Sequence, residues 1–173
     1  MRPGGAAWLP AALALALVLA GCGRATPDDA DTPGARIERA AVAAGVVADP
    51  ARLDPAGAYA SDSDHLCIRP GAGEGRGGGY RIGVAVDYGD GHACVGRGTA
   101  RGTGRIAVAL SDRCRFDAQF DGERLAFPAV LPPGCDDLCT GRASLSALAV
   151  ARLSAADAEA AALRGPDRRA LCD

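Results

Sequence analysis

Lysine and asparagine are both missing from the 173-residue sequence, and all 19 of its basic residues are arginine. This bias, together with abundant Ala and Gly, is typical of a GC-rich genome, so arginine is weak evidence here for phosphate or carboxylate recognition. The basic residues are scattered, with only Arg168 and Arg169 adjacent, and the net charge is −2. Because a nucleic-acid-binding protein needs a basic stripe to neutralise phosphates, we expect no nucleic-acid partner.

The apolar stretch near the start of the chain is too short to cross a membrane as a helix. It extends from Ala11 to Ala20 (AALALALVLA), about half the length that a membrane-spanning helix needs. Arg2 precedes it and small residues follow it. A basic end, a short apolar centre and small residues predict a signal peptide over residues 1–21.

The end of this signal carries the most specific motif in the chain, Leu19-Ala20-Gly21-Cys22. It resembles the lipobox of bacterial lipoproteins, in which an aliphatic residue and two small residues precede a cysteine. The resemblance implies that Cys22 is the lipid attachment site: its sulfur forms a diacylglyceryl thioether, signal peptidase II cuts before it, and the new amino group is acylated. Two or three acyl chains suffice for stable attachment. Gly23 stands where an Asp would resemble an inner-membrane retention signal, which favours the outer membrane.

Composition divides the rest of the chain into a linker and a domain. Residues 22–55 are rich in Ala, Asp, Pro and Gly and have few large apolar side chains, which predicts a flexible, lipidated tether. Within it, residues 36–48 have the composition of a short helix that ends at Asp49-Pro50. Residues 56–173 are then expected to form a single disulfide-stabilised, β-rich domain of ordinary size.

Short runs of alternating polarity, bounded by Gly, Asp and Pro, predict strands in this domain. Asp121-Gly122 predicts a type I′ hairpin turn, because both central residues of that turn need positive φ. Residues 144–153 are rich in Ala, but their alternation favours a last strand over a helix. The expected strands cover residues 57–61, 65–69, 80–88, 92–100, 105–110, 115–120, 123–130 and 144–153.

The expected fold is therefore mainly β, a small antiparallel meander that forms a barrel or a two-layer sandwich. A short C-terminal helix follows the last strand, with Ser154 as its N-cap, Asp157 in its first turn and an end before Gly165-Pro166.

Six cysteines remain after Cys22, and an even number in an exported domain predicts three disulfides. With a tight turn at Asp121-Gly122, Cys114 comes near the chain that leads to Cys135, so we expect it to pair with Cys135 or Cys139. Cys172 is expected to take the other of these two, which leaves Cys67 to pair with Cys94. The six are Cys67, Cys94, Cys114, Cys135, Cys139 and Cys172.

The same cysteines allow a metal or redox alternative, which is less favoured. Cys135 and Cys139 have C-x3-C spacing, and His92 lies two residues before Cys94. In an oxidising compartment thiols pair more often than they bind zinc, and a thioredoxin-like motif needs C-x-x-C. We therefore expect no metal and no cofactor.

Candidate catalytic and ligand-binding residues are few. No G-x-S-x-G nucleophile motif is present, and the glycine-rich loop at 71–79 lacks the ending of a phosphate-binding loop. His65 and His92 are candidate general bases, Asp62 and Asp64 a weak cation site, and Arg142 a candidate anion-binding residue beside a disulfide.

These observations favour a non-enzymatic function. We expect an outer-membrane-anchored periplasmic lipoprotein that binds an envelope protein or glycan, or has a structural role in the envelope, with the membrane as a partner through its lipid. One alternative is an inhibitor, because size, lipobox, meander and disulfides together are similar to the membrane-bound lysozyme inhibitors, although none of that family's binding-loop motifs matches. The other alternative is a hydrolase that uses His65 or His92.

Overall fold

The structure is a computed structural model that describes residues 32–47, 49, 52–71 and 79–173. The chain divides into two compact units, Met1–Val47 and Ala48–Asp173, and each is described by itself. The predicted signal peptide, the predicted lipid attachment site at Cys22 and most of the glycine-rich loop at 71–79 lie outside the described residues. No helix within the described residues is long and apolar enough to span a bilayer.

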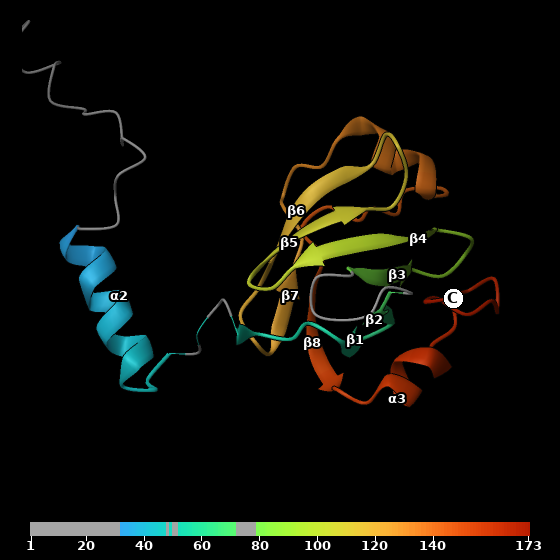
Figure 1. Ribbon diagram of the computed structural model, residues 1–173. Helices are drawn as coiled ribbons and strands as arrows, with labels where there is room; N and C mark the ends of the chain where they lie inside the picture. The colour runs from blue at the N-terminus through green and yellow to red at the C-terminus, as the bar shows by residue number, and fades with distance from the viewer. Residues whose placement is uncertain (1–31, 48, 50–51, 72–78) are drawn as a thin grey trace, which may run out of the picture. The chain divides into compact units, whose positions relative to one another are not determined.

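The first unit contains one described helix, α2 (Pro33–Ala43; Figure 1). Thr32 caps its start, because the Thr32 hydroxyl oxygen accepts a hydrogen bond from the Ala35 N–H at 3.2 Å. Gly45, with φ at 70°, provides the left-handed residue that ends many helices. The helix expected over residues 36–48 is therefore present, but it begins at its N-cap Thr32 and ends at its C-cap Ala44, just before Gly45, rather than at Asp49-Pro50.

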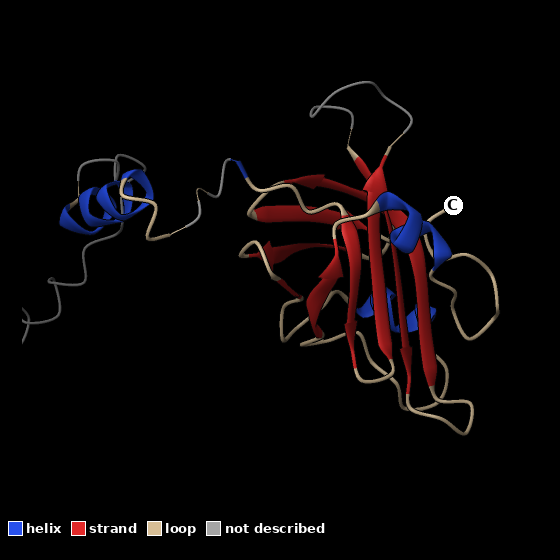
Figure 2. Cartoon of the chain, turned by 90° about the horizontal axis from the view of Figure 1, so that it is seen from below, coloured by secondary structure: helices blue, strands red, loops and turns tan. Residues whose placement is uncertain are grey.

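The second unit is a closed barrel of eight antiparallel strands (Figure 2). Each strand pairs with the next, and β8 returns to pair with β1, which confirms the mainly β fold class and distinguishes the barrel from a two-layer sandwich. A short 3-10 helix, η4 (Pro133–Leu138), precedes β8, and α3 (Asp157–Ala162) follows it. The strands are β1 (Gly57–Ser61), β2 (Asp64–Pro70), β3 (Tyr80–Asp87), β4 (Ala93–Gly102), β5 (Arg105–Ala109), β6 (Arg115–Phe120), β7 (Arg124–Ala126) and β8 (Ala149–Ser154).

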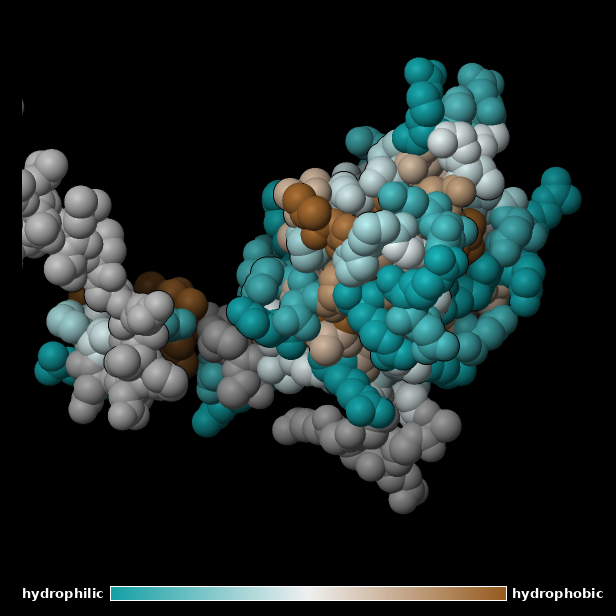
Figure 3. All heavy atoms as spheres, turned by 90° about the horizontal axis from the view of Figure 1, so that it is seen from above, coloured by the Kyte–Doolittle hydropathy of each residue, from teal (hydrophilic) through white to brown (hydrophobic). Residues whose placement is uncertain are grey.

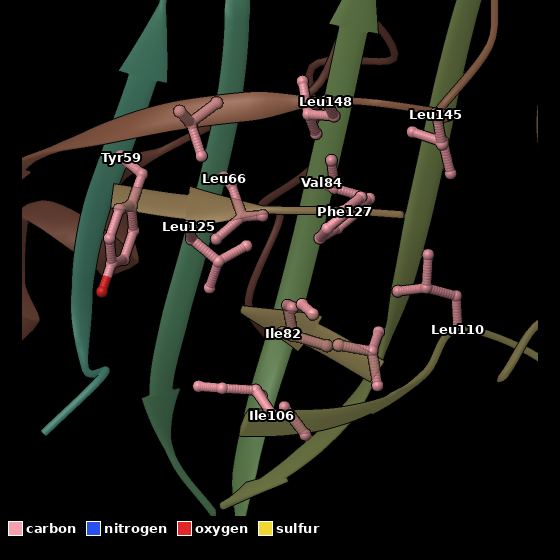
Figure 4. Close-up of a cluster of buried hydrophobic side chains, with 14 of the residues drawn as sticks. Tyr59, Leu66, Ile82, Val84, Ile106, Leu110, Leu125, Phe127, Leu145 and Leu148 are labelled. Atoms are coloured by element: carbon pink, nitrogen blue, oxygen red, sulfur yellow. The ribbon is translucent and has the colours of Figure 1, made fainter. Parts of the chain in front are cut away.

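Apolar side chains fill the barrel interior (Figure 4). Alternate residues of each strand point inward, so Leu66 and Ile68 of β2 lie beside Val84 and Ile82 of β3, and all four are at most 1% exposed. An eight-stranded barrel encloses just enough space for such side chains. The outer surface, rather than the interior, is therefore where a partner can bind.

The strands after β6 differ from their expected bounds. β7 ends at Ala126 instead of residue 130, because Pro128 has no N–H to donate to a neighbouring strand. β8 starts at Ala149 instead of residue 144, after Ala147 adopts a left-handed φ of 57°. Ser154 ends β8 and is not the N-cap of α3, which is Ala156; the Ser154 hydroxyl oxygen accepts a hydrogen bond from the Ala156 N–H at 3.1 Å.

The hairpin turn between β6 and β7 lies one residue later than predicted. Phe120 pairs with Leu125, so the turn is centred on Gly122-Glu123, and only Gly122 has positive φ. The Asp121 carboxylate accepts hydrogen bonds from the N–H groups of Arg124 (2.7 Å) and Glu123 (2.9 Å). These bonds, that from Arg124 first, lower the pKa of Asp121 and hold it at the start of the turn instead of at its centre.

Three disulfides are present, as expected, with a different connectivity. Cys114 joins Cys135, which is one of the two predicted partners. The expectations that Cys172 joins Cys135 or Cys139, and that Cys67 joins Cys94, are wrong. The chain after α3 returns over β2 and β3, and this brings Cys172 to Cys67; Cys139 lies beside Cys94 in an isolated β-bridge and is bonded to it.

Candidate functional site

The chain's own C-terminal segment, residues 157–173, lies on the outside of the barrel next to β1, β2 and β3 (Figures 1 and 2). Ala160 of α3 and Leu171 pack on outward-facing residues of β1, β2 and β3, and both are fully buried. Gly83 makes this contact possible, since a Cβ at Gly83 would overlap the Leu171 backbone. Val95 and Arg97 of β4 also contact this segment, whereas Thr99 and Arg101, farther along β4, and the outward residues of β5 and β6 lie beyond these contacts.

Two arginines hold the C-terminal segment against the barrel. Arg69 of β2 makes a two-pronged ion pair with Asp157, at 2.7 and 2.8 Å, and also donates to the Cys172 carbonyl oxygen. Arg97 of β4 pairs with both carboxylate oxygens of Asp167 at 2.9 Å. These hydrogen bonds lower the pKa values of Asp157 and Asp167, so both carboxylates remain charged at mild acidity.

The barrel surface beyond the C-terminal segment carries a groove that follows strand β5, and we name it the β5 groove. The depression forms because the outward residues of β5 in this stretch are Ala107 and Ala109, whose side chains are single methyl groups. Longer side chains from β4 and β6 form its two walls. The groove has a volume of about 520 Å³ and is lined by Thr99, Arg101, Ala107, Val108, Ala109, Arg115, Phe116 and Asp117.

Strand register fixes the arrangement of these walls. Arg101 of β4 and Asp117 of β6 flank Ala107. Thr99 and Arg115 flank the next outward alanine of β5, Ala109, on the same two strands. Successive outward residues on a strand are about 6.8 Å apart. The groove therefore presents two cross-strand rows, one with a cation and an anion and the other with a hydroxyl and a cation.

The charged side chains of the groove are unequally paired. Arg105, at the β4–β5 turn, lies 3.7 Å from Asp117, and Arg115 lies 2.9 Å from Asp112. Arg101 is exposed, its stem lies beside Gly79, and it has no acidic partner among the residues that the structure describes. Three guanidinium groups thus face two carboxylates, and the excess positive charge lies toward the β4–β5 turn.

The other end of the groove is held in place covalently. A second hollow, which shares Thr99, Ala109 and Arg115 with the first, continues to Ser111 and Asp112 at the β5–β6 turn. Just beyond that turn, Cys114 is bonded to Cys135, and Arg113 pairs with Asp137 at 2.5 Å. This end of the groove is therefore attached to η4.

A smaller hollow of about 300 Å³ contains one of the two histidines, His65, together with Ser63, Asp87 and Arg164. The Ser63 hydroxyl donates to the backbone carbonyl oxygen of Asp87 at 2.7 Å, so it is bonded to the backbone and not to an imidazole. His65 Nδ1 is buried without a hydrogen-bond partner in the described part of the chain. The hollow gathers a serine, a histidine and an aspartate, but no described hydrogen bond links a nucleophile to a base.

The second histidine, His92, supports a turn. Its Nδ1 accepts a hydrogen bond from the Arg142 N–H at 3.1 Å, and Gly141 packs directly on the ring. The nearby Cys94–Cys139 disulfide and the hydrogen bond from the Thr140 hydroxyl to the Gly91 carbonyl oxygen, at 2.7 Å, fix the same turn. The Arg142 side chain, predicted as a candidate anion-binding residue, is exposed on this turn.

The thiols of the metal alternative are consumed in disulfides. Cys94 bonds Cys139, and Cys135 bonds Cys114. Within the described ranges no group of three or more His, Cys, Asp or Glu side chains is placed to hold a metal ion. The predicted cation site consists of Asp62 and Asp64. Asp62 lies in the β1–β2 turn with a left-handed φ of 49°. Burial raises the pKa of the Asp64 carboxyl group, and its Oδ1 atom is buried without a hydrogen-bond partner in the described part of the chain.

Sequence reasoning did not identify the β5 groove. The available signal was the alternation in Arg105–Leu110 (RIAVAL), where the outward positions after Arg105 are both alanine, followed by Arg115 and Asp117 on the same face. From above in the orientation of Figure 1, the barrel unit presents mostly hydrophilic side chains with a few apolar ones between them (Figure 3).

Comparison with known proteins found no matching family model, no matching curated protein and no matching solved structure.

Proposed function

We propose that the protein is an outer-membrane-anchored periplasmic lipoprotein whose barrel is a non-enzymatic binding module of the cell envelope. The lipobox at residues 19–22 supports the location, because acyl chains on Cys22 would hold the chain at a membrane. The observation that carries the binding role is the β5 groove, a charged depression on the barrel surface that the C-terminal segment does not cover. The partner is an envelope protein or glycan.

The location is tested with the full-length gene expressed in a Gram-negative host, beside a Cys22→Ser variant. We expect the wild-type protein in the outer-membrane fraction with an acyl mass on Cys22, and the variant in the soluble periplasmic fraction. An unmodified Cys22 in the wild type, or a variant that stays in the membrane, would show that the proposed lipid-anchored location is wrong.

The binding role is tested with a photo-reactive residue placed in the groove at Thr99, and at exposed Glu159 of α3 as the matched control. Irradiation of intact envelopes should yield a distinct adduct from position 99 and not from position 159. If the two positions yield the same adducts, or position 99 yields none, the β5 groove is not the binding site.

A second candidate function is inhibition of a lysozyme. The closed eight-stranded barrel with three disulfides favours it, and so does the disulfide-fixed turn that exposes Arg142, since a pre-positioned cation suits a cleft lined by catalytic carboxylates. A lysozyme assay with micromolar protein decides this candidate, and undiminished lysozyme activity removes it.

A further inference from the structure

We infer that the β5 groove binds an extended peptide segment that carries a carboxylate, and that Arg101 and Arg105 hold this carboxylate at the end of the groove near the β4–β5 turn. The inference rests on the proposed binding function and specifies its ligand. The shared chemistry is the carboxylate, whose source is either the C-terminus of a chain or an acidic side chain.

Charge complementarity selects an anion for this end of the groove. Arg101 lies opposite Ala107, and Arg105 lies two residues before Ala107 on β5, so the two arginines are diagonal neighbours about 7–8 Å apart at Cα. Arg105 already reaches diagonally to Asp117 at 3.7 Å, which shows that side chains span this distance. Two guanidinium groups beside one carboxylate leave one positive charge for a ligand to neutralise.

The dimensions of the groove select a chain in extended conformation. Its walls belong to β4 and β6, two strands that flank β5, so their backbones are about 9.6 Å apart. A single extended chain fits between such walls over a floor of methyl groups. Its same-face side chains repeat about every 6.8 Å, which matches the spacing of Thr99 and Arg101 along one wall and of Arg115 and Asp117 along the other.

The length of the groove sets the length of the ligand. From Arg105 to Ser111 the β5 segment spans six residue steps, about 20 Å of extended chain. A peptide of about five residues can therefore lie along it with its carboxylate at Arg101 and Arg105. The opposite end offers the Asp112 carboxylate, whose side chain is fully exposed, to the amide N–H groups of the peptide.

The experiment uses the full mature chain in detergent micelles and three synthetic probes, followed by amide chemical shifts in NMR. The probes are N-acetylated pentaalanine with a free C-terminal carboxylate, its C-terminal amide, and an N-acetylated, C-amidated pentapeptide with a central glutamate. We expect one or both carboxylate peptides to shift the amides of residues 99–117 at up to about 5 mM, and the neutral amide to bind at least tenfold more weakly. Which carboxylate peptide binds more tightly identifies the source of the carboxylate.

Variants test the two arginines. Arg101→Gln together with Arg105→Gln should weaken binding at least tenfold, and about 0.5 M salt should weaken binding to the wild type. The matched control is Arg124→Gln, which removes an exposed arginine of β7 outside the groove and should leave affinity unchanged. Unperturbed amide shifts elsewhere in the double variant show that it is folded.

The inference is overturned if the neutral peptide binds as tightly as the carboxylate peptides, if the shifted amides lie outside residues 99–117, or if no probe binds. Its failure differs from failure of the proposed function. A specific adduct from position 99 with a glycan, and no peptide binding, keeps the binding function and removes the peptide, whereas an absent adduct removes the groove as a site altogether.

Discussion

Gly83 of β3 lies directly beneath the backbone of Leu171, and the two residues can meet because Gly83 has no side chain. A Cβ at this position would overlap the Leu171 carbonyl group. Because Leu171 is fully buried and next to the Cys67–Cys172 disulfide, this contact determines how closely the C-terminal segment approaches the barrel.

Substitution of Gly83 by Ala should therefore destabilise the protein by about 1–3 kcal/mol, the usual cost of forcing an extra methyl group into a packed site. Urea unfolding of the full chain gives the change in free energy. Gly34→Ala is the matched control, since a Cβ there meets no atom within 4 Å, and it should leave barrel stability unchanged. Equal stability of Gly83→Ala and the wild type would mean that the Leu171 backbone is not packed closely on Gly83 of β3.

The disulfides should contribute to stability in the order of the loops they close. Cys67–Cys172 closes a loop of 105 residues and Cys114–Cys135 one of 21. In the chain-entropy description, loops of these sizes correspond to about 4.7 and about 3 kcal/mol. Paired Cys→Ala variants compared by urea unfolding should therefore show the larger loss for Cys67–Cys172; the reverse order would mean that contacts within the folded state, not loop entropy, determine the contribution.

The sequence predicted the local elements of this fold well, because they depend on neighbouring residues. β1 has the predicted bounds, and the alternation in residues 80–88 placed β3 within one residue. Proline and left-handed residues account for the errors near β7 and β8, where Pro128 and Ala147 interrupt the alternation. These interruptions depend on how the chain leaves the sheet, which a pattern of polarity does not record.

Long-range relationships were not predictable in the same way. Closure of the barrel requires β1 to pair with β8 across most of the domain, and no local signal records that pairing. Cys67 and Cys172 are 105 residues apart in the sequence. They meet only because the C-terminal segment folds back over Gly83, and no local pattern of residues indicates this. The β5 groove is formed by three neighbouring strands. Ala107 and Ala109 therefore indicate a groove only once the pairing of β5 with β4 and β6 is known.

Substitution of Arg152 in β8 should lower the stability of the barrel. Its guanidinium lies 4.8 Å from the Phe120 ring centroid and 5.6 Å from that of Tyr59, and it donates hydrogen bonds to the Tyr59 hydroxyl and the Asp54 carbonyl oxygen. Lysine keeps the charge but loses the flat guanidinium beside the two rings, and its shorter side chain does not reach the position of Nη2, which donates both hydrogen bonds. We expect Arg152→Lys to cost about 1–2 kcal/mol in urea unfolding.

The control for this prediction is Arg124→Lys, at an exposed position of β7. It should change stability by less than about 0.5 kcal/mol. Equal losses in the two variants would mean that the aromatic contacts of Arg152 do not contribute to stability.

Acid should loosen the C-terminal segment before it unfolds the barrel. The pKa values of Asp157 and Asp167 are lowered by hydrogen bonds from Arg69 and Arg97, so each carboxylate stabilises the folded state above its unfolded pKa, about 3.9. This stabilisation is lost as the pH falls from about 4 through the lower folded values, where protonation breaks both ion pairs. We expect hydrogen exchange in α3, corrected for its intrinsic pH dependence, to accelerate below about pH 4.

A variant in which Asp157 and Asp167 are both replaced by asparagine separates this effect from general acid unfolding. It should exchange faster than the wild type at neutral pH and show little further acceleration below about pH 4, because it has no carboxylate left to protonate at either ion pair. The Cys67–Cys172 disulfide keeps the end of the chain attached in both proteins, so the comparison reports on the ion pairs. If the wild type and the variant accelerate equally in acid, protonation elsewhere controls the segment and the two arginines do not hold it.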